Sequence, residues 1–187
     1  MLVLGHTGIA LGAALLADAA LSRHAGYRSR REHFDLRLLF IGSLLPDLID
    51  KPAALLFPGS LGAGRTLAHT LLFLLITLAA SVCLWRRGST WLAVLAFGTL
   101  LHLLLDEMWL YYRTMLWPVY GWGFPGPAAD GWVRLWGLLT GLGGYLRPGE
   151  IAGAVILVYF AAMLFRHHVW RRFFGSGGVL GYSPQRP

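Results

Sequence analysis

The sequence predicts an all-α membrane protein: a polytopic transmembrane helical bundle of about five spans plus a short interfacial helix. Only 13% of its 187 residues are charged and 56% are hydrophobic, whereas a soluble domain carries about 25% charged residues. The apolar residues form runs close to the roughly 20 residues that cross a bilayer. The arginines lie between these runs, as topology signals do.

Five apolar runs account for the expected spans, at residues 3–21, 38–57, 67–85, 91–112 and 151–165. The fifth run is short for a span. Pro46 lies inside the second run, and because proline cannot donate a backbone hydrogen bond, we expect a kink there. We expect one transmembrane domain over residues 1–174. The Gly/Ser/Pro-rich residues 175–187 are predicted to be a disordered cytoplasmic tail.

A stretch rich in Trp, Gly and Pro separates the fourth and fifth runs. Trp132, Leu135, Trp136 and Leu139 would share one face of a helix. Tryptophan favours the membrane interface, so we expect a short helix lying in that interface.

The arginines also predict the orientation of the chain. The segments that follow the first, third and fifth runs are the basic ones, and with five spans all three lie on one side. The positive-inside rule makes that side cytoplasmic. We therefore expect a multi-pass protein of the cytoplasmic (inner) membrane, with its N-terminus outside and its C-terminus cytoplasmic. The net charge of +7 is explained by topology, so we expect the lipid bilayer as partner and no nucleic acid.

Histidines and aspartates gather at one membrane depth in this topology. An ionisable group in a span is costly unless it is paired, hydrated or bound to metal. His102 and Asp106 are four residues apart and share a helix face. Each residue alone has an ordinary alternative, such as a helix cap or an ion pair between Asp50 and Lys51. The shared depth favours one metal site, with ligands His6, Asp47, His69, His102 and Asp106.

Imidazole and carboxylate ligands suit zinc best among divalent metals, with manganese or iron as alternatives. Such an ion can activate water at neutral pH. Asp50 or Glu107 would then be the general base. Arg65 and Arg113 could hold a phosphate or carboxylate group, or simply extend to the interface. The single cysteine, Cys83, excludes a cysteine-based zinc site.

Several short motifs follow one another in an order that resembles the YdjM-like inner-membrane metal-dependent hydrolases. The resemblance implies a membrane-bound, metal-dependent hydrolase, without a substrate. Two motifs depart from the family pattern: Ile49 and Lys51 stand where the family often has Asp and His, and Gly64 stands where it often has His. The matching motifs are Gly5-His6, Gly42-Ser-Leu-Leu-Pro-Asp-Leu-Ile-Asp50, Arg65-Thr-Leu-Ala-His-Thr70, His102-Leu-Leu-Leu-Asp106 and Trp117-Pro118.

We therefore expect a hydrolase that uses a metal-activated water near the extracytoplasmic face, on a lipid-like ester or a phosphoester. One alternative is a transporter or ion-handling protein in which His and Asp relay protons or metal. Another is a non-catalytic scaffold with a structural metal. The number of metal ions and the oligomeric state stay open.

Overall fold

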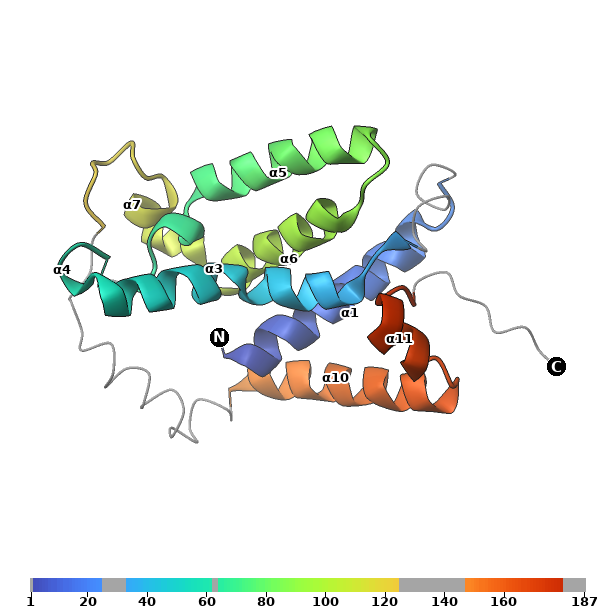
Figure 1. Cartoon of the computed structure of the whole chain (residues 1–187). Coiled ribbons are helices and arrows are strands. Elements are labelled where there is room, and N and C mark those ends of the chain that lie inside the picture. The colour runs from blue at the N-terminus through green and yellow to red at the C-terminus, as the bar shows by residue number, and fades with distance from the viewer. Residues whose placement is uncertain (1, 25–32, 62–63, 125–146, 180–187) are drawn as a thin grey trace.

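The computed structural model describes residues 2–24, 33–61, 64–124 and 147–179, and within them every regular element is helical (Figure 1). The all-α class is confirmed, and each of the five apolar runs forms a helical segment. The long helices are α1 (Val3–Leu21), α3 (Leu36–Leu56), α5 (Leu71–Arg86), α6 (Trp91–Leu105) and α10 (Pro148–Arg166). The short ones are α4 (Pro58–Leu61), η2 (Leu67–His69), η3 (Met108–Tyr111), α7 (Tyr112–Met115) and α11 (Trp170–Ser176).

Local sequence signals fix several helix ends. The Asp35 carboxylate accepts the Arg37 N–H at the start of α3, and the Thr70 hydroxyl accepts the Phe73 N–H at the start of α5. Both are ordinary N-caps, which satisfy backbone donors that a first turn leaves free. Pro148 begins α10, where its missing N–H costs nothing. Gly177 ends α11 with a φ of 68°, a conformation that glycine adopts readily.

Glycines bring the helices together in pairs. A Cβ on Gly42 of α3 would lie 2.2 Å from the Leu95 carbonyl oxygen of α6, and one on Gly8 of α1 would lie 2.1 Å from the Gly153 oxygen of α10. Such small-residue contacts are typical of membrane helices. Figure 1 shows α5 and α10 on opposite sides of the bundle, with α1, α3 and α6 between them. Any larger side chain at these glycines would force the pairs apart.

Pro46 lies within α3, which continues as one helix as far as Leu56. Proline leaves the carbonyl four residues earlier without its helical donor. That carbonyl belongs to Gly42, and it accepts a hydrogen bond of 3.3 Å from the Thr99 hydroxyl of α6. The proline therefore frees a polar group that α6 satisfies.

The surface of the bundle is strongly apolar. Leu11, Leu39 and Phe160 are buried in the core, whereas Leu16 and Val158 are 74% and 69% exposed. Among the described residues, two helices, α1 and α10, are long and apolar enough to cross a membrane. A third span is possible if α6 and the segment Met108–Met115 count as one, although they are bent by 77°.

The expected count of five spans is therefore not confirmed. The second run forms α3, which is long enough but carries Arg37, Asp47, Asp50 and Lys51. The third run forms α5, which has only 16 residues. The fourth run, expected to be continuous over 91–112, breaks after Leu105.

Two further expectations concern the ends of the described segments. The interfacial helix over Trp132 to Leu139 lies outside the described residues. The expected domain boundary at residue 174 falls inside α11, and the described structure extends to Val179. There the Gly177 carbonyl accepts a hydrogen bond from Leu36 N. Residues 180–187 of the expected tail lie outside the described residues.

Candidate metal centre

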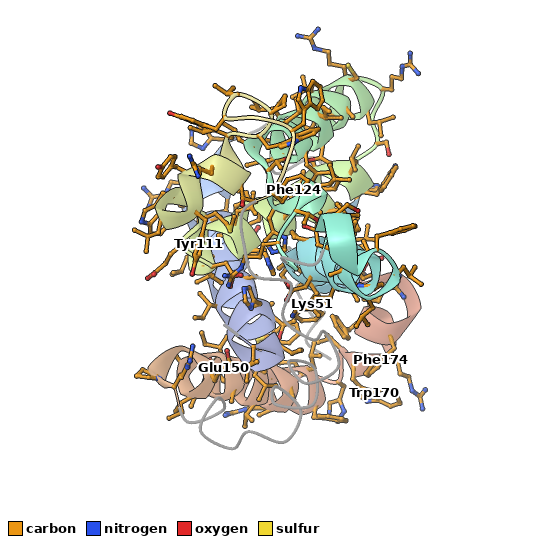
Figure 2. The ribbon with its side chains drawn as sticks, turned by 90° about the vertical axis from the view of Figure 1, so that its left-hand side faces the viewer. Lys51, Tyr111, Phe124, Glu150, Trp170 and Phe174 are labelled. Carbon is orange, nitrogen blue, oxygen red and sulfur yellow. The ribbon has the colours of Figure 1, made fainter. Side chains whose placement is uncertain are left out.

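The five expected metal ligands come together at one end of the bundle. His6 lies in the first turns of α1 and Asp47 in α3, His69 ends η2, and His102 and Asp106 lie at the end of α6. The three histidines and Asp106 are buried. Figure 2 looks at this end of the molecule, where Lys51, Tyr111 and Glu150 are labelled. Four chain segments therefore contribute to one polar cluster.

Each of the three histidines has its Nδ1 held by a hydrogen-bond acceptor. His6 Nδ1 lies 2.8 Å from the Leu2 carbonyl oxygen, and His102 Nδ1 lies 2.7 Å from the Ser43 carbonyl oxygen. His69 Nδ1 lies 2.7 Å from the Asp50 carboxylate. Carbonyl and carboxylate oxygens only accept, so in each neutral ring Nδ1 carries the proton and Nε2 carries a lone pair.

These lone pairs converge. The Nε2 atoms of His69 and His102 are 3.3 Å apart, and the rings of His6 and His102 stack with centroids 4.2 Å apart. Two ligands of a tetrahedral zinc, each at about 2.0–2.1 Å, would be about 3.4 Å apart. The buried His6 Nε2 has no hydrogen-bond partner among the described residues, and Asp106 Oδ1 lies 3.2 Å from it. The donor set and its spacing fit a divalent ion.

The two carboxylates complete two overlapping groups of possible ligands. His6, His102 and Asp106 form one group, and Asp47, His69 and His102 form the other. Within each group the ligand atoms lie within 4.8 Å of one another. His102 belongs to both, and a neutral imidazole has one lone pair to give. Because His102 can ligate only one ion through Nε2, the two groups are overlapping alternatives for the position of that ion.

Asp50 is buried and engaged by η2. Its Oδ2 accepts hydrogen bonds from Thr66 N, His69 N and His69 Nδ1, and its Oδ1 accepts one from Ala68 N. A carboxylate on the far nitrogen of a ligating imidazole fixes the orientation of the ring. The alternative pairing of Asp50 with Lys51 is not found, because Lys51 Nζ lies 2.6 Å from Asp47 Oδ2 instead.

Arg65 lies beside the cluster. Its Nε and Nη2 donate to Asp106 Oδ2 at 3.0 and 2.8 Å, and its guanidinium stacks 4.9 Å from the centre of the Tyr111 ring. Burial lowers the pKa of Arg65, but the charge and hydrogen bonds of Asp106 raise it more, so the pKa lies above its ordinary value. Arg65 is therefore a fixed cation next to the cluster.

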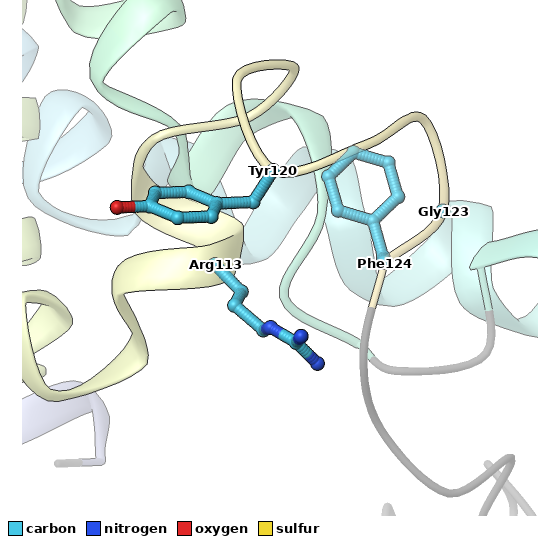
Figure 3. A pocket seen from close by; sticks show the side chains of 4 residues that line it. All are labelled: Arg113, Tyr120, Gly123 and Phe124. Atoms are coloured by element: carbon cyan, nitrogen blue, oxygen red, sulfur yellow. The ribbon is translucent and has the colours of Figure 1, made fainter.

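Glu107 and Arg113 lie at exposed positions, whereas Arg65 is half-buried. Glu107 follows Asp106 directly but is exposed, with a φ of 52°. Arg113, in α7, is exposed and lines an open pocket with Tyr120, Gly123 and Phe124 (Figure 3). Its pocket is formed by α7 and the segment after it, and includes none of the His and Asp residues of the cluster.

Glu150 was not anticipated from the sequence. It lies in the first turn of α10, is buried, and accepts hydrogen bonds from Leu2 N and Gly5 N at the start of α1. It therefore anchors the helical turn that carries His6, and a negative charge suits a helix N-terminus. A signal existed: this is an acidic residue at the start of an apolar helix. Its partner, however, lies about 150 residues away.

The fold and the cluster together define a helical protein with apolar spans and a buried His/Asp centre suited to a divalent metal. The chain belongs to the YdjM inner membrane protein family, whose model matches residues 1–174. It is thus a protein of the inner membrane, in contact with the lipid bilayer. No curated protein and no solved structure matches the chain.

Proposed function

We propose that this protein is a membrane-bound metal-dependent hydrolase. The observation that carries the proposal is the convergence of three buried imidazoles whose Nδ1 atoms are all held by acceptors. That arrangement leaves three Nε2 lone pairs facing one another and the carboxylates of Asp47 and Asp106. A cation is the simplest partner for such a set.

The ligands in this proposal are His6, Asp47, His69, His102 and Asp106, and zinc is the metal their chemistry favours, with manganese or iron as alternatives. A divalent ion held there acts as a Lewis acid and supplies a nucleophile from water at neutral pH. Asp50 orients His69, because its oxygens already accept four hydrogen bonds. Glu107, which is exposed and adjacent to Asp106, remains the better candidate for a general base.

The substrate in this proposal is a lipid-like ester or phosphoester that arrives from the membrane. The segment directly after Asp106 supports this, since Trp109, Leu110 and Tyr112 are exposed. Aromatic side chains favour the level of the lipid headgroups. In the proposed topology, with the N-terminus outside and the C-terminus cytoplasmic, the centre faces the extracytoplasmic side.

The test is hydrolysis by purified full-length protein in detergent. We expect cleavage of a chromogenic phosphoester or carboxylester, loss of that cleavage with a chelator, and recovery when zinc or manganese is returned. A His102→Ala, Asp106→Ala double variant should lose both activity and retained metal, because it removes two ligands that are four residues apart on α6.

A matched control is His167→Ala, which removes an exposed histidine just after α10. It should keep the metal and the activity of the unaltered chain. Equal metal content in the double variant and the unaltered chain, measured by elemental analysis, would refute the site. Stoichiometric metal with no hydrolysis of either substrate class would instead favour a structural metal.

A further inference from the structure

Two cations stand at the exposed side of the proposed centre, and their placement bears on its substrate. The side chains of Lys51 and Arg65 are 44% and 37% exposed, whereas those of Asp47 and Asp106 are 17% and 5% exposed. The three imidazoles are buried beneath. From the solvent inward, the site therefore presents cations, then carboxylates, then imidazoles.

In both carboxylates, one oxygen pairs with a cation and the other faces a histidine. Asp47 gives Oδ2 to Lys51 Nζ at 2.6 Å and directs Oδ1 to His69 Nε2 at 3.7 Å. Asp106 gives Oδ2 to Arg65 and directs Oδ1 to His6 Nε2 at 3.2 Å. Both cations thus lie one carboxylate group away from the converging imidazoles, on two different chain segments.

A divalent ion would make the site attractive to an anion. Lys51 and Arg65 neutralise two of the three negative charges of Asp47, Asp50 and Asp106. The two positive charges of the ion therefore exceed the negative charge that is left. A neutral carboxylic ester gains nothing from this excess, whereas an anionic phosphoryl group is attracted to it.

The cations also keep hydrogen-bond donors to spare. A guanidinium has five N–H donors and an ammonium three. Asp106 accepts one hydrogen bond from Nε and one from Nη2 of Arg65, and Asp47 accepts a single hydrogen bond from Lys51. The centre of the Tyr111 ring lies 4.9 Å from Cζ of the Arg65 guanidinium and helps to hold this side chain in place. A planar guanidinium and an ammonium both suit the oxygens of a phosphoryl group.

From this geometry we propose, building on the hydrolase function above, that Lys51 and Arg65 bind the phosphoryl group of an anionic phosphoester, so that the substrate class is phosphoesters rather than carboxylesters. Lys51 supplies a permanent positive charge next to Asp47. Both residues touch the substrate without ligating the metal.

The test is calorimetric binding of inorganic phosphate to full-length protein that has been loaded with zinc and desalted. We expect Lys51→Gln and Arg65→Gln each to weaken phosphate binding by about tenfold, the effect of losing a hydrogen bond to a charged group. Zinc affinity should stay the same or rise in both variants, because each removes a positive charge near the ion. Lys51→Arg keeps the charge and should bind phosphate like the unaltered chain.

Opposite changes in phosphate and zinc affinity separate this role from simple damage to the site, which would weaken both. Arg166→Gln serves as control, since it removes an exposed arginine at the end of α10, and it should bind phosphate normally. Displacement of bound phosphate by a soluble aryl phosphate or by micellar phosphatidic acid would support the proposal and tell a free phosphoester from a lipid headgroup.

Normal phosphate binding by Lys51→Gln and Arg65→Gln would overturn this inference, and so would phosphate binding by Lys51→Arg as weak as that of Lys51→Gln. Zinc binding with chelator-sensitive hydrolysis of a carboxylester, but without phosphate binding, would reject the substrate class alone and leave the proposed hydrolase standing. Absence of zinc binding in the unaltered chain would reject both.

Discussion

Both ends of helix α3 carry charged side chains, but those at its start are paired with one another, whereas the carboxylates toward its other end face histidines. At its first residues, the Arg37 guanidinium donates to both oxygens of Asp35 and to the carbonyls of Phe174 and Gly175. Toward its other end, Asp47 and Asp50 face histidines whose Nε2 lone pairs have no fixed donor. The first network joins α3 to α11, whereas the second leaves the Nε2 lone pairs of the histidines without a donor among the described residues.

The difference shows how to separate structural polar groups from functional ones in a membrane bundle. Buried polar groups are normally paired, because an unpaired one costs free energy. At the Asp35 end the donors and acceptors match. At the Asp50 end the acceptors are in excess, with His6 Nε2 lacking a partner among the described residues. An excess of converging acceptors is what a cation-binding site requires.

The largest effect that would test this comparison is stabilisation by metal. At a free zinc concentration about 100 times its dissociation constant, zinc should add about 2.7 kcal/mol to the stability of the folded chain. Thermal unfolding in detergent, with and without zinc, measures this gain. His69→Ala should abolish it, whereas His168→Ala, beyond α10, should leave it unchanged. An equal gain in all three proteins would mean that zinc binds elsewhere.

A smaller effect is expected from Asp50. Because this carboxylate holds Nδ1 of His69, Asp50→Ala should weaken zinc binding by about 10- to 100-fold. Competition with a chromophoric chelator measures the affinity. Asp50→Asn keeps an acceptor oxygen, so its zinc affinity should lie between that of the unaltered chain and that of Asp50→Ala. Full affinity in Asp50→Ala would show that η2 orients His69 without help from this carboxylate.

The smallest effect should come from the matched end of α3. Asp35→Ala removes an N-cap and an ion pair, which should cost about 1 kcal/mol of stability. Zinc affinity should not change, because the cluster lies toward the other end of the helix. Thermal unfolding of this variant measures its loss of stability, and zinc titration of the same variant measures its zinc affinity. A loss of zinc affinity here would contradict the independence of the two ends.

The ion pair of Asp35 and Arg37 also makes the stability of the folded chain depend on pH, in a direction that can be predicted. Burial acts to raise the pKa of Asp35, but the hydrogen bonds and charge of Arg37 lower it more, so the pKa lies below the ordinary 3.8. A carboxyl with a lowered pKa stabilises the folded state above its unfolded pKa and loses that contribution as pH falls through the folded pKa. Asp35→Asn should therefore lose less stability than the unaltered chain as the solution is acidified below about pH 4.

Much of the fold and of the proposed ligand set could be predicted from the sequence. Apolar runs set the bounds of α1 almost to the residue, and the arginine pattern placed His6, His69 and His102 at one depth. The partners of Asp50 and Lys51 could not be predicted, because neighbours in sequence compete for them: Asp50 binds His69 and Lys51 binds Asp47.

The break after α6 illustrates a second limit. The run 91–112 is apolar throughout most of its length, so hydropathy predicts one span. The chain turns by 77° there, with Glu107 in a left-handed conformation. The polar pair Asp106-Glu107 marks the place, but the cause of the break is tertiary, since Arg65 holds Asp106 from another segment.

The glycine contact between α3 and α6 has a consequence for how the protein can vary. Gly42 and Gly98 allow the two backbones to touch, and the same approach brings the Ser43 carbonyl to the His102 ring. The distance between α3 and α6 therefore also determines the orientation of the His102 imidazole. A methyl group added at either glycine would not merely loosen the bundle; it would turn the ring away from its neighbours, so tolerance to mutation at these two positions is limited by chemistry as well as by packing.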